Sequence, residues 1–419
     1  MPFTKENKAP SMMTGTDHQS WIVAQLGARD HYAVSRSLKL FGALSSLVTD
    51  CWAPQKKLPY GASLAGRFHR GLQDVPVKSW TGRSLLFEAA HRMHGVAGWD
   101  LIVKRNAWFQ NMAVEALKQL SLAHKESAST KAKVLFSYSY SSLAQARWAK
   151  AKGWTFVLGQ IDPGPLDLFH FEPLEQQTAS GSFSAQLRQR YEEDWRQECA
   201  LADVIVVNSQ WALTSIVRAG APVEKVKVIP LAYEHQSVVE RRQYPSEYTN
   251  LRPMKVLFLG NLNRRKGGME ILDAARKCLG LPVQFVLVGN AQPELRTDAA
   301  SIPNVKMIGA VPRAQVGEWY EQADVFLFPT HSDGFGITQL EALSHSLPVI
   351  ASRHCGDVIT DGVNGIRLSE VTGDAISLAV RRLLITPGVL EDLSRNCRID
   401  RRYSLASLGQ QLLHSVRAN

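Results

Sequence analysis

Residues 325–352 read VFLFPTHSDGFGITQLEALSHSLPVIAS, and this stretch contains the repeating unit of the fold. The apolar run at 325–330 predicts a buried strand, the turn HSDGFG follows, and a helix is expected to begin near Ile337. A second apolar run at 348–352 predicts the next strand. Short apolar runs between turn signals are typical of buried parallel strands. Strand, helix and strand in this order predict an α/β unit.

The same alternation extends over most of the chain. Apolar runs predict further strands at 21–27, 133–140, 155–160, 204–209 and 226–231, and a second series at 255–260, 283–289 and 305–309. Helix-length segments between them, such as 142–153 and 214–220, end at Gly. A polar stretch without a clear period separates the two series. The 419 residues therefore predict two α/β domains.

The division of the chain follows from these patterns. We expect a disordered tail at 1–20, a Rossmann-like domain at 21–235, a linker at 236–253, a second Rossmann-like domain at 254–400 and a C-terminal helix at 401–419 that packs back on the first domain. The stretch 52–110, which is rich in Trp, Arg and His, is expected to form helices and an extended loop.

Charge is concentrated in the first part of the chain. The net charge is +10, and residues 1–160 hold 21 Lys and Arg against 9 Asp and Glu. A basic half attracts anionic lipid headgroups or an anionic acceptor, and a solvated basic surface explains it equally well. No recognition helix, zinc finger or aromatic RNA-binding signature is present, so we expect no nucleic-acid partner.

The sequence carries no signal for export or for a membrane span. No apolar run reaches about 18 residues, and the polar first 20 residues lack the apolar core of a signal peptide. The five cysteines are scattered and form no CxxC pair, which favours a reducing compartment. We expect a cytoplasmic protein, with peripheral contact at the inner membrane face as an alternative.

Two carboxylates mark the first candidate site. Ligands of open α/β sheets bind beyond the carboxyl ends of strands, and here Asp333 precedes the predicted helix while Glu341 lies just over a turn inside it. Both are expected to face one ligand and to accept hydrogen bonds from sugar hydroxyls. Gly334 and Gly336 free backbone amides for a diphosphate. The alternative is a capped helix with two surface acids.

This segment resembles the retaining glycosyltransferases of family 4, the glycosyl transferases group 1, which share the GT-B fold. Their hallmark is an acid, seven spacers and Glu, inside a segment like PSxxEGFGxxxxEAxxxGxPVI. This chain departs twice, because Asp333 stands where Glu is usual and Ser346 replaces a Gly. The resemblance implies that Asp333 contacts the donor sugar and Glu341 the ribose, with Gly334, Phe335, Gly336 and Ile337 around the nucleotide-sugar. It also implies two Rossmann-like domains with mostly parallel sheets that face each other across a central cleft.

A basic loop follows the strand predicted at 255–260. In the family, a strand, Gly, a basic loop and Lys-Gly open a helix, and Lys266-Gly267 stands at the matching distance from Gly260. The position after Gly260 is often Arg but is Asn261 here, and Arg265 is expected to supply the missing charge. Arg265 and Lys266 are therefore predicted to bind the diphosphate and to stabilise it as it leaves. A solvated basic turn is the alternative.

The acceptor side is less defined. The segment 26–44 resembles the first loop and helix of a subgroup, which implies that Gly27 turns beneath the reacting centre and that Arg29 and His31 approach the acceptor or the donor phosphate. Many relatives carry His-Asp after the strand at 155–160, but this chain reads GQIDPGP. Asp162 is the first candidate for orienting or deprotonating the acceptor hydroxyl, or else a turn residue. Gln160 and Tyr138 are further acceptor-side candidates.

The function implied by the resemblance is transfer of a sugar from a UDP-, GDP- or ADP-sugar to an acceptor glycan, lipid or small molecule, with retention of configuration. No Asp-x-Asp, HExxH or HxH is present, so we expect no metal or other cofactor. His91 and His94 are expected to have a structural or acceptor-side role. The alternatives are another GT-B activity such as a sugar-phosphate synthase, and a binding protein that has lost catalysis. A dehydrogenase is disfavoured because no GxGxxG follows the predicted strands.

Overall fold

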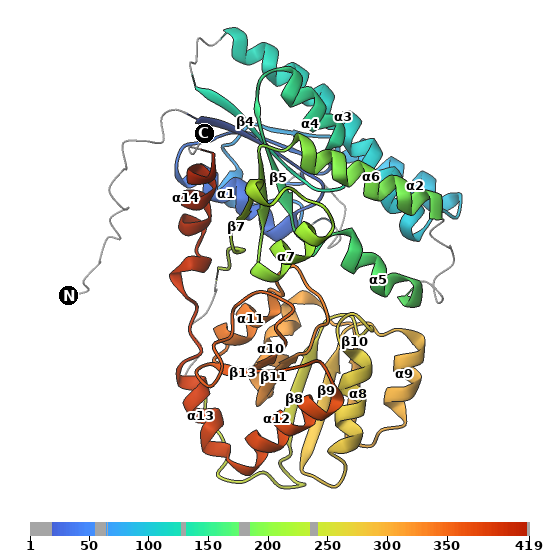
Figure 1. Ribbon diagram of the computed structural model, residues 1–419, viewed down its shortest axis with the longest axis vertical. Helices are drawn as coiled ribbons and strands as arrows, with labels where there is room; N and C mark the ends of the chain where they lie inside the picture. The colour runs from blue at the N-terminus through green and yellow to red at the C-terminus, as the bar shows by residue number, and fades with distance from the viewer. Residues whose placement is uncertain are drawn as a thin grey trace, which may run out of the picture.

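The computed structural model describes residues 19–54, 64, 66–126, 131–175, 185–234 and 242–416. These residues form two α/β domains, with the N-terminal domain above the C-terminal domain in Figure 1. Every recorded pair of neighbouring strands within the two sheets is parallel. The predicted α/β class with two mainly parallel sheets is confirmed.

The N-terminal sheet has the strand order β3-β2-β1-β4-β5-β6-β7. The strands are β1 (Gln19–Gln25), β2 (Leu44–Thr49), β3 (Val77–Ser79), β4 (Ala132–Tyr138), β5 (Thr155–Gln160), β6 (Val204–Val207) and β7 (Val226–Val228). The helices are α1 (Ala33–Leu40), α2 (Thr81–Met93), α3 (Gly98–Glu126), α4 (Leu143–Ala151), α5 (Pro165–Glu175), α6 (Ala185–Leu201) and α7 (Gln210–Arg218). Along β1, Trp21 and Val23 enter one apolar cluster while Ile22 and Ala24 enter the other, because successive strand residues point to opposite faces. Helices therefore cover both faces of this sheet.

The C-terminal sheet has the strand order β10-β9-β8-β11-β12-β13. The strands are β8 (Met254–Leu259), β9 (Val283–Val288), β10 (Val305–Gly309), β11 (Val325–Phe328), β12 (Val349–Ala351) and β13 (Gly365–Arg367). The helices are α8 (Gly268–Lys277), α9 (Pro293–Ala300), α10 (Val316–Gln322), α11 (Thr338–Ser344), α12 (Gly373–Ile385) and α13 (Pro387–Arg395). Two apolar clusters again fill the two faces. β8 and β11 are neighbours in the middle of the sheet, so the loops that follow them meet at its carboxyl edge.

The last helix, α14 (Leu405–Ser415), lies against the N-terminal domain (Figure 1). Leu408 and Leu412 join the cluster that contains Leu38 of α1. Gly409 packs so closely that a Cβ there would lie 2.7 Å from the carbonyl oxygen of Ser37. The chain thus crosses from the second domain back to the first.

Three strands were not predicted from the sequence. β2 is interrupted by serines, while β3 and β13 contain only one apolar residue each, Val77 and Ile366, and so show no apolar run. β3 and the long helices α2 and α3 occupy the stretch 52–110, where helices and a loop were expected. Several apolar runs also extend beyond their strands: the run at 325–330 contains β11, which ends at Phe328.

The connecting segments are described only in part. Most of the expected tail lies outside the described residues, and Gln19 and Ser20 already belong to β1. The first part of the expected linker, 235–241, also lies outside them. Arg242 then donates to the carbonyl oxygens of His345 and Ala323, which ties this end of the linker to the C-terminal domain. Within the described residues, no helix combines the length and the apolar character needed to cross a membrane.

Candidate active site

A pocket of about 870 Å³, measured with the solvent space open to it, lies where the two domains meet. Its C-terminal walls are the loops that follow β8 and β11 and the start of α11, and its N-terminal wall includes Ile161, which follows β5. The lining residues are Ile161, Leu231, Phe258, Leu259, Gly260, Asn261, Asn263, Arg265, Lys266, Phe328, Asp333, Phe335, Gly336, Ile337 and Thr338. Most of the C-terminal residues predicted to bind a nucleotide-sugar therefore line one pocket.

The loop after β8 brings Lys266 to this pocket because Gly267 allows a close approach. Gly267 has φ +77°, and a Cβ there would overlap the carbonyl oxygen of Pro329 in the loop after β11. The backbone N–H of Lys266 donates to Asn263 Oδ1 at 2.9 Å, which closes the turn. Only glycine can adopt a left-handed conformation this close to a neighbouring carbonyl group. The glycine of the Lys-Gly pair therefore allows the two loops to make contact.

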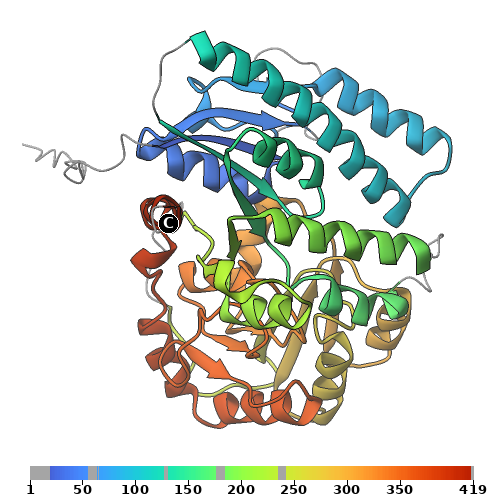
Figure 2. The same ribbon diagram turned by 45° about the horizontal axis from the view of Figure 1, so that its top comes forward.

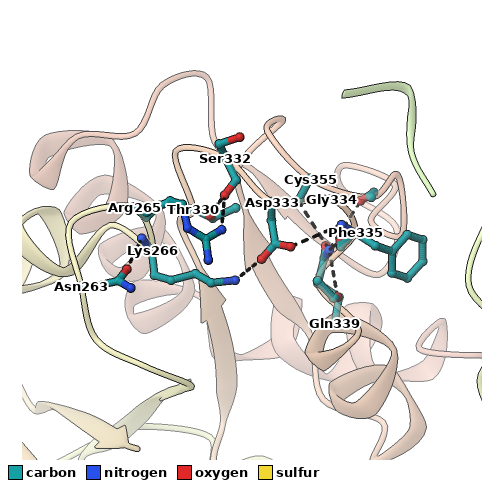
Figure 3. Close-up of polar contacts among 12 residues, drawn as sticks. Asn263, Arg265, Lys266, Thr330, Ser332, Asp333, Gly334, Phe335, Gln339 and Cys355 are labelled. Atoms are coloured by element: carbon teal, nitrogen blue, oxygen red, sulfur yellow. Dashed lines mark hydrogen bonds and ion pairs between the residues drawn. The ribbon is translucent and has the colours of Figure 1, made fainter. Parts of the chain in front are cut away.

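Asp333 lies opposite these basic residues. Its carboxylate forms an ion pair with Lys266 and accepts the N–H of Phe335 at 3.3 Å, while Arg265 donates to the Ser332 carbonyl at 2.7 Å (Figure 3). Burial raises the pKa of the Asp333 carboxyl, but the charges of Lys266 and Arg265 outweigh burial and hold that pKa below its ordinary value. Asp333 is therefore a carboxylate at neutral pH.

The loop between Asp333 and α11 is held tightly. A Cβ on Gly334 would overlap the carbonyl oxygen of Ile161 in the other domain, and a Cβ on Gly336, which has φ +79°, would overlap the Phe328 ring. The Phe335 ring is 97% buried and packs edge-on against Tyr403. Its N–H bonds Asp333, so one of the amides expected to be free already has a partner. Because α11 has only seven residues, the cations contribute most of the positive potential here.

Glu341 lies deeper in α11 and is not among the residues that line the pocket. Its Oε2 accepts the hydroxyl of Tyr320 at 2.9 Å, and its Oε1 is 3.8 Å from a guanidinium nitrogen of Arg313. Arg313 is largely exposed. Glu341 and Asp333 therefore come from the same end of α11, but each carboxylate has a different cation beside it.

On the N-terminal side, Asp162 follows β5. Its Oδ1 accepts three hydrogen bonds: from the Tyr140 hydroxyl at 2.8 Å, the Gln160 amide at 2.6 Å and the Gly164 N–H at 2.7 Å. Burial raises the pKa of the Asp162 carboxyl, and these donors offset only part of that effect. The bond to Gly164 is a turn contact. The hydrogen bond from Tyr140 comes from a distant part of the chain, and the one from Gln160 comes from the end of β5. Together they fix the position of the Asp162 carboxylate.

Glu198 of α6 supports this arrangement, and the sequence did not predict its role. Its two oxygens accept the N–H of Tyr140 at 2.7 Å and of Ser142 at 2.9 Å. Tyr140 has φ +67°, a left-handed conformation that is costly for a residue with a side chain. Burial raises the pKa of Glu198 to about 7. The sequence shows only a Glu in a polar helix, so nothing in it identifies this role.

The remaining predicted residues lie around β1 and β4, and none of them lines the pocket between the domains. The Gly27 N–H donates to Asp50 Oδ1 at 2.8 Å, which in turn pairs with Arg67. The Arg29 guanidinium lies 5.3 Å from the ring centre of Tyr138, so these two candidates are neighbours.

His31 is one of three consecutive residues with positive φ, from Asp30 to Tyr32. Burial lowers the pKa of its imidazole, and the charges of Arg313 and Arg36 lower it further against the opposing effect of Glu234. Because Arg313 belongs to the C-terminal domain, its charge acts on His31 from the other domain.

Direct hydrogen bonds join the domains beside the pocket. Ser209 Oγ donates to the Gly334 carbonyl at 2.7 Å, and the Trp211 indole donates to Ser332 Oγ at 2.9 Å. The Ser332 hydroxyl donates to Asp167 of α5 at 2.7 Å. These residues hold the loop that carries Asp333 against α5 and α7. Sequence reasoning missed them because their partners are more than 100 residues away.

Within the described ranges, no three His, Cys, Asp or Glu side chains come together as a metal site. All five cysteines are buried and free. His91 and His94 each bond a carbonyl one turn back in their helix region, Phe87 and Ala90 respectively, which is a structural contact.

A known protein family matches most of the C-terminal domain. Residues 253–385 match the Glycosyl transferases group 1 family. This match contains the basic loop, Asp333 and Glu341.

Two curated relatives of similar sequence are named as enzymes of polysaccharide biosynthesis. The chain is 24% identical over 215 residues to the amylovoran biosynthesis glycosyltransferase AmsK of Erwinia amylovora, covering 48% of this chain and 51% of that protein. It is 25% identical over 167 residues to the capsular polysaccharide biosynthesis glycosyltransferase CapM of Staphylococcus aureus, covering 37% and 43%. The chain thus spans about half the length of the curated relatives that it matches.

The similarity in structure covers the whole molecule. The crystal structure of HepE from Anabaena in complex with UDP and glucose superposes with a TM-score of 0.62 and 17% identity, covering 96% of this chain and all of that chain. At this identity the likeness establishes the fold. The predicted GT-B architecture is confirmed.

Proposed function

We propose that this protein is a glycosyltransferase that moves a sugar from a nucleotide diphosphate-sugar to an acceptor hydroxyl, with retention of anomeric configuration and without a metal ion. The main support is the meeting of Arg265, Lys266 and Asp333 in the pocket between the domains. Without the open solvent space, the pocket volume is about 340 Å³, which is in the range of small-molecule sites. Apart from Ile161 and Leu231, its lining residues lie within the stretch that matches the glycosyl transferases group 1 family.

The donor is proposed to bind by exchanging one ion pair for another. Lys266 leaves Asp333 and pairs with the diphosphate, where Arg265 provides the second cation. The freed Asp333 carboxylate then accepts hydrogen bonds from hydroxyls of the donor sugar. Glu341, fixed by Tyr320, is proposed to accept bonds from the ribose hydroxyls. Because Asp is one methylene shorter than the usual Glu, Asp333 is expected to influence which donor sugar fits.

The reaction breaks the bond between the anomeric carbon and the β-phosphate oxygen and forms a bond from the acceptor oxygen to the same carbon. Negative charge grows on the departing diphosphate, and Arg265 and Lys266 stabilise it. The acceptor proton passes to Asp162, whose raised pKa makes it a stronger base than an exposed Asp. The close contact between Gly334 and Ile161 holds the two domains together beside the pocket, and this contact is proposed to limit hydrolysis of the donor by water.

The two cations are proposed to replace the divalent ion that many nucleotide-sugar enzymes use. The names of these two relatives favour a growing polysaccharide as the acceptor. The UDP and glucose in the HepE complex make UDP-glucose the first donor to test.

A binding screen followed by a transfer assay tests this proposal. Thermal unfolding is measured with UDP, GDP and ADP, because saturation at about 100 times Kd stabilises a protein by roughly 2.7 kcal/mol. The matching nucleotide-sugar is then incubated with oligosaccharide acceptors in EDTA, and the product anomer is assigned by NMR. An inverted product or a requirement for metal would refute those parts of the proposal. Binding without turnover on any acceptor would instead indicate a binding protein.

A further inference from the structure

A second pocket lies on one face of the C-terminal sheet, apart from the pocket between the domains. Its volume is about 320 Å³, measured with the solvent space open to it. The strands β8, β9 and β10 form one wall, and α10 with the residue after it forms the other. The lining residues are Lys255, Leu257, Gln284, Val286, Lys306, Trp319, Gln322 and Ala323, and none of them lines the pocket between the domains.

A row of polar side chains across three neighbouring strands creates this pocket. Each strand carries its polar residue in second position, since β8 reads MKVLFL, β9 reads VQFVLV and β10 reads VKMIG. Lys255 pairs with Gln284 in the sheet, and Lys306 pairs with Val286, two residues further along β9. Because side chains alternate across a strand, Lys255 shares its face with Leu257, which belongs to an apolar cluster. The row therefore interrupts a face that is otherwise apolar.

The polar groups around this pocket converge on it without partners of their own. Five side chains of the lining form no hydrogen bond or ion pair with any described residue: Lys255, Gln284, Lys306, Trp319 and Gln322. Asp324 accepts the backbone N–H of Lys255 at 2.8 Å, but its carboxylate is paired with Arg252 at 2.7 Å. The exposed acids of α10, Glu318 and Glu321, do not line the pocket. The two ammonium charges are therefore not cancelled by a carboxylate in the lining.

The chemistry of these groups matches a phosphorylated sugar. Two ammonium groups attract a phosphate dianion. The Gln carboxamides can donate to sugar hydroxyls and accept from them, and the Trp319 indole presents an apolar ring face to the C–H groups of a sugar. Without the open solvent space, the pocket volume is about 40 Å³, whereas one water needs about 10–15 Å³. A phosphate group therefore suits the enclosed part, and the sugar would lie at the open mouth.

This pocket lies at the end of the sheet opposite the proposed donor site. In Figures 1 and 2 the carboxyl ends of the C-terminal strands face the N-terminal domain, where the loops after β8 and β11 line the pocket between the domains. Lys255 precedes Gly260 by five residues of β8, which span about 17 Å in an extended strand. A ligand bound beside Lys255 is therefore distinct from a nucleotide-sugar held by Lys266.

We propose that the pocket between α10 and the amino ends of β8, β9 and β10 binds a phosphorylated sugar as a second ligand of the C-terminal domain. Lys255 and Lys306 hold the phosphate, Gln284 binds sugar hydroxyls, and Trp319 contacts the sugar ring. This site does not rest on the proposed glycosyl transfer, because none of its residues belongs to the proposed donor site.

Isothermal titration calorimetry and tryptophan fluorescence of the full chain test this site. The probes are glucose 6-phosphate, glucose 1-phosphate, inorganic phosphate and glucose. At least one sugar phosphate should bind about tenfold or more tightly than inorganic phosphate or glucose, because it makes both sets of contacts. Its fluorescence change should disappear in Trp319→Phe. Binding should be equal in the wild type and in Lys266→Met, which separates this site from the pocket between the domains.

Lysine variants test the phosphate contacts. Lys255→Met and Lys306→Met keep the aliphatic stem and remove the charge, and each should weaken binding of the sugar phosphate about fivefold, as expected for a partly exposed ion pair. The matched control is Lys78→Met, because Lys78 is exposed on β3, an edge strand of the N-terminal sheet, as Lys306 is on the edge strand β10. The control should bind within about twofold of the wild type.

The outcomes separate this site from the proposed function. No binding of either sugar phosphate at millimolar concentration would overturn the proposal, as would equal weakening in Lys306→Met and Lys78→Met. Inorganic phosphate that binds as tightly as the sugar phosphates would show an anion site without sugar recognition and also overturn it. Loss of binding in Lys266→Met would place the ligand between the domains instead. Sugar-phosphate binding at this site without any sugar transfer would leave the site intact and refute the proposed function.

Folding of the variants is checked by circular dichroism and thermal unfolding without ligand. Lys306 is exposed on an edge strand, so Lys306→Met should unfold at the wild-type temperature and keeps the test valid if Lys255→Met is unstable.

Discussion

Replacing Lys266 by Met gives the sharpest prediction, because the neighbouring basic residue Arg264 provides a matched control. Lys266 has a side chain that is 19% exposed, pairs with Asp333 and lies 5.0 Å from the ring centre of Phe328. Arg264, two residues earlier, is exposed and does not line the pocket. The Met side chain keeps the length and the contact with Phe328 but removes the charge.

The magnitude follows from the contacts. A charge-assisted hydrogen bond to the diphosphate is worth about 1.5–3 kcal/mol, so the Kd for the nucleotide should rise roughly ten- to hundredfold. In the free protein, Asp333 keeps Arg265 nearby but loses its direct partner, and we expect a loss of about 1–3 kcal/mol in the free energy of unfolding. Asp333→Asn in the same chain should recover part of that loss because it removes the buried charge.

Acid unfolding tests the Lys266–Asp333 ion pair independently. The pKa of Asp333 is lowered in the folded protein, so its stabilisation is present above the ordinary pKa of Asp and is lost as pH falls through the lowered value. Lys266→Met removes part of the cause, so the stability of the variant should fall less than that of the wild type as pH drops below the ordinary pKa of Asp.

Isothermal titration calorimetry with UDP, followed by GDP and ADP, measures the binding effect in the wild type, Lys266→Met and the control Arg264→Met. Arg264→Met should bind within about twofold of the wild type, since only long-range charge is lost. Wild-type affinity in Lys266→Met, or equal weakening in both variants, would refute the assignment of the diphosphate to Lys266. Circular dichroism of each variant checks that a weak titration does not reflect unfolding.

Three further predictions concern the other carboxylates. Glu341→Ala should remove most of the thermal stabilisation by nucleotide, and an unchanged shift on differential scanning fluorimetry would take Glu341 out of the site. Asp162→Asn should keep donor affinity and lower kcat about a hundredfold or more; near-normal kcat in a steady-state assay would leave Asp162 as a turn residue. The pKa of Glu198 is raised to about 7, so the folded state binds more protons between the unfolded value near 4.5 and 7, and stability should fall as pH rises through this window. Glu198→Gln should remove up to about 3 kcal/mol of that fall in urea titrations at pH 5 and 7.5, and parallel pH profiles of the two proteins would contradict the burial of this carboxyl.

The strand pattern was readable because buried parallel strands leave nearly continuous apolar runs. β5 and β10 coincide with the runs predicted for them, at 155–160 and 305–309. β2 was not predicted because Ser45 and Ser46 interrupt its apolar run, and β13 was not predicted because Ile366 is its single apolar residue. Strand order and the return of α14 to the first domain depend on packing between distant segments, which periodicity does not encode.

The sequence alone determined the two α/β domains, the basic loop at 264–266 and the distance in sequence between Asp333 and Glu341. Each of these features depends only on residues that are close together in the chain. Only the tertiary structure decided that Lys266, and not Arg264, pairs with Asp333. It also decided that Glu198 holds the Tyr140 turn and that Gly334 meets Ile161 across the domains. These contacts join residues from 58 to more than 170 positions apart. Their energy comes from burial and exclusion of water, and burial is a property of the folded molecule that no single segment carries.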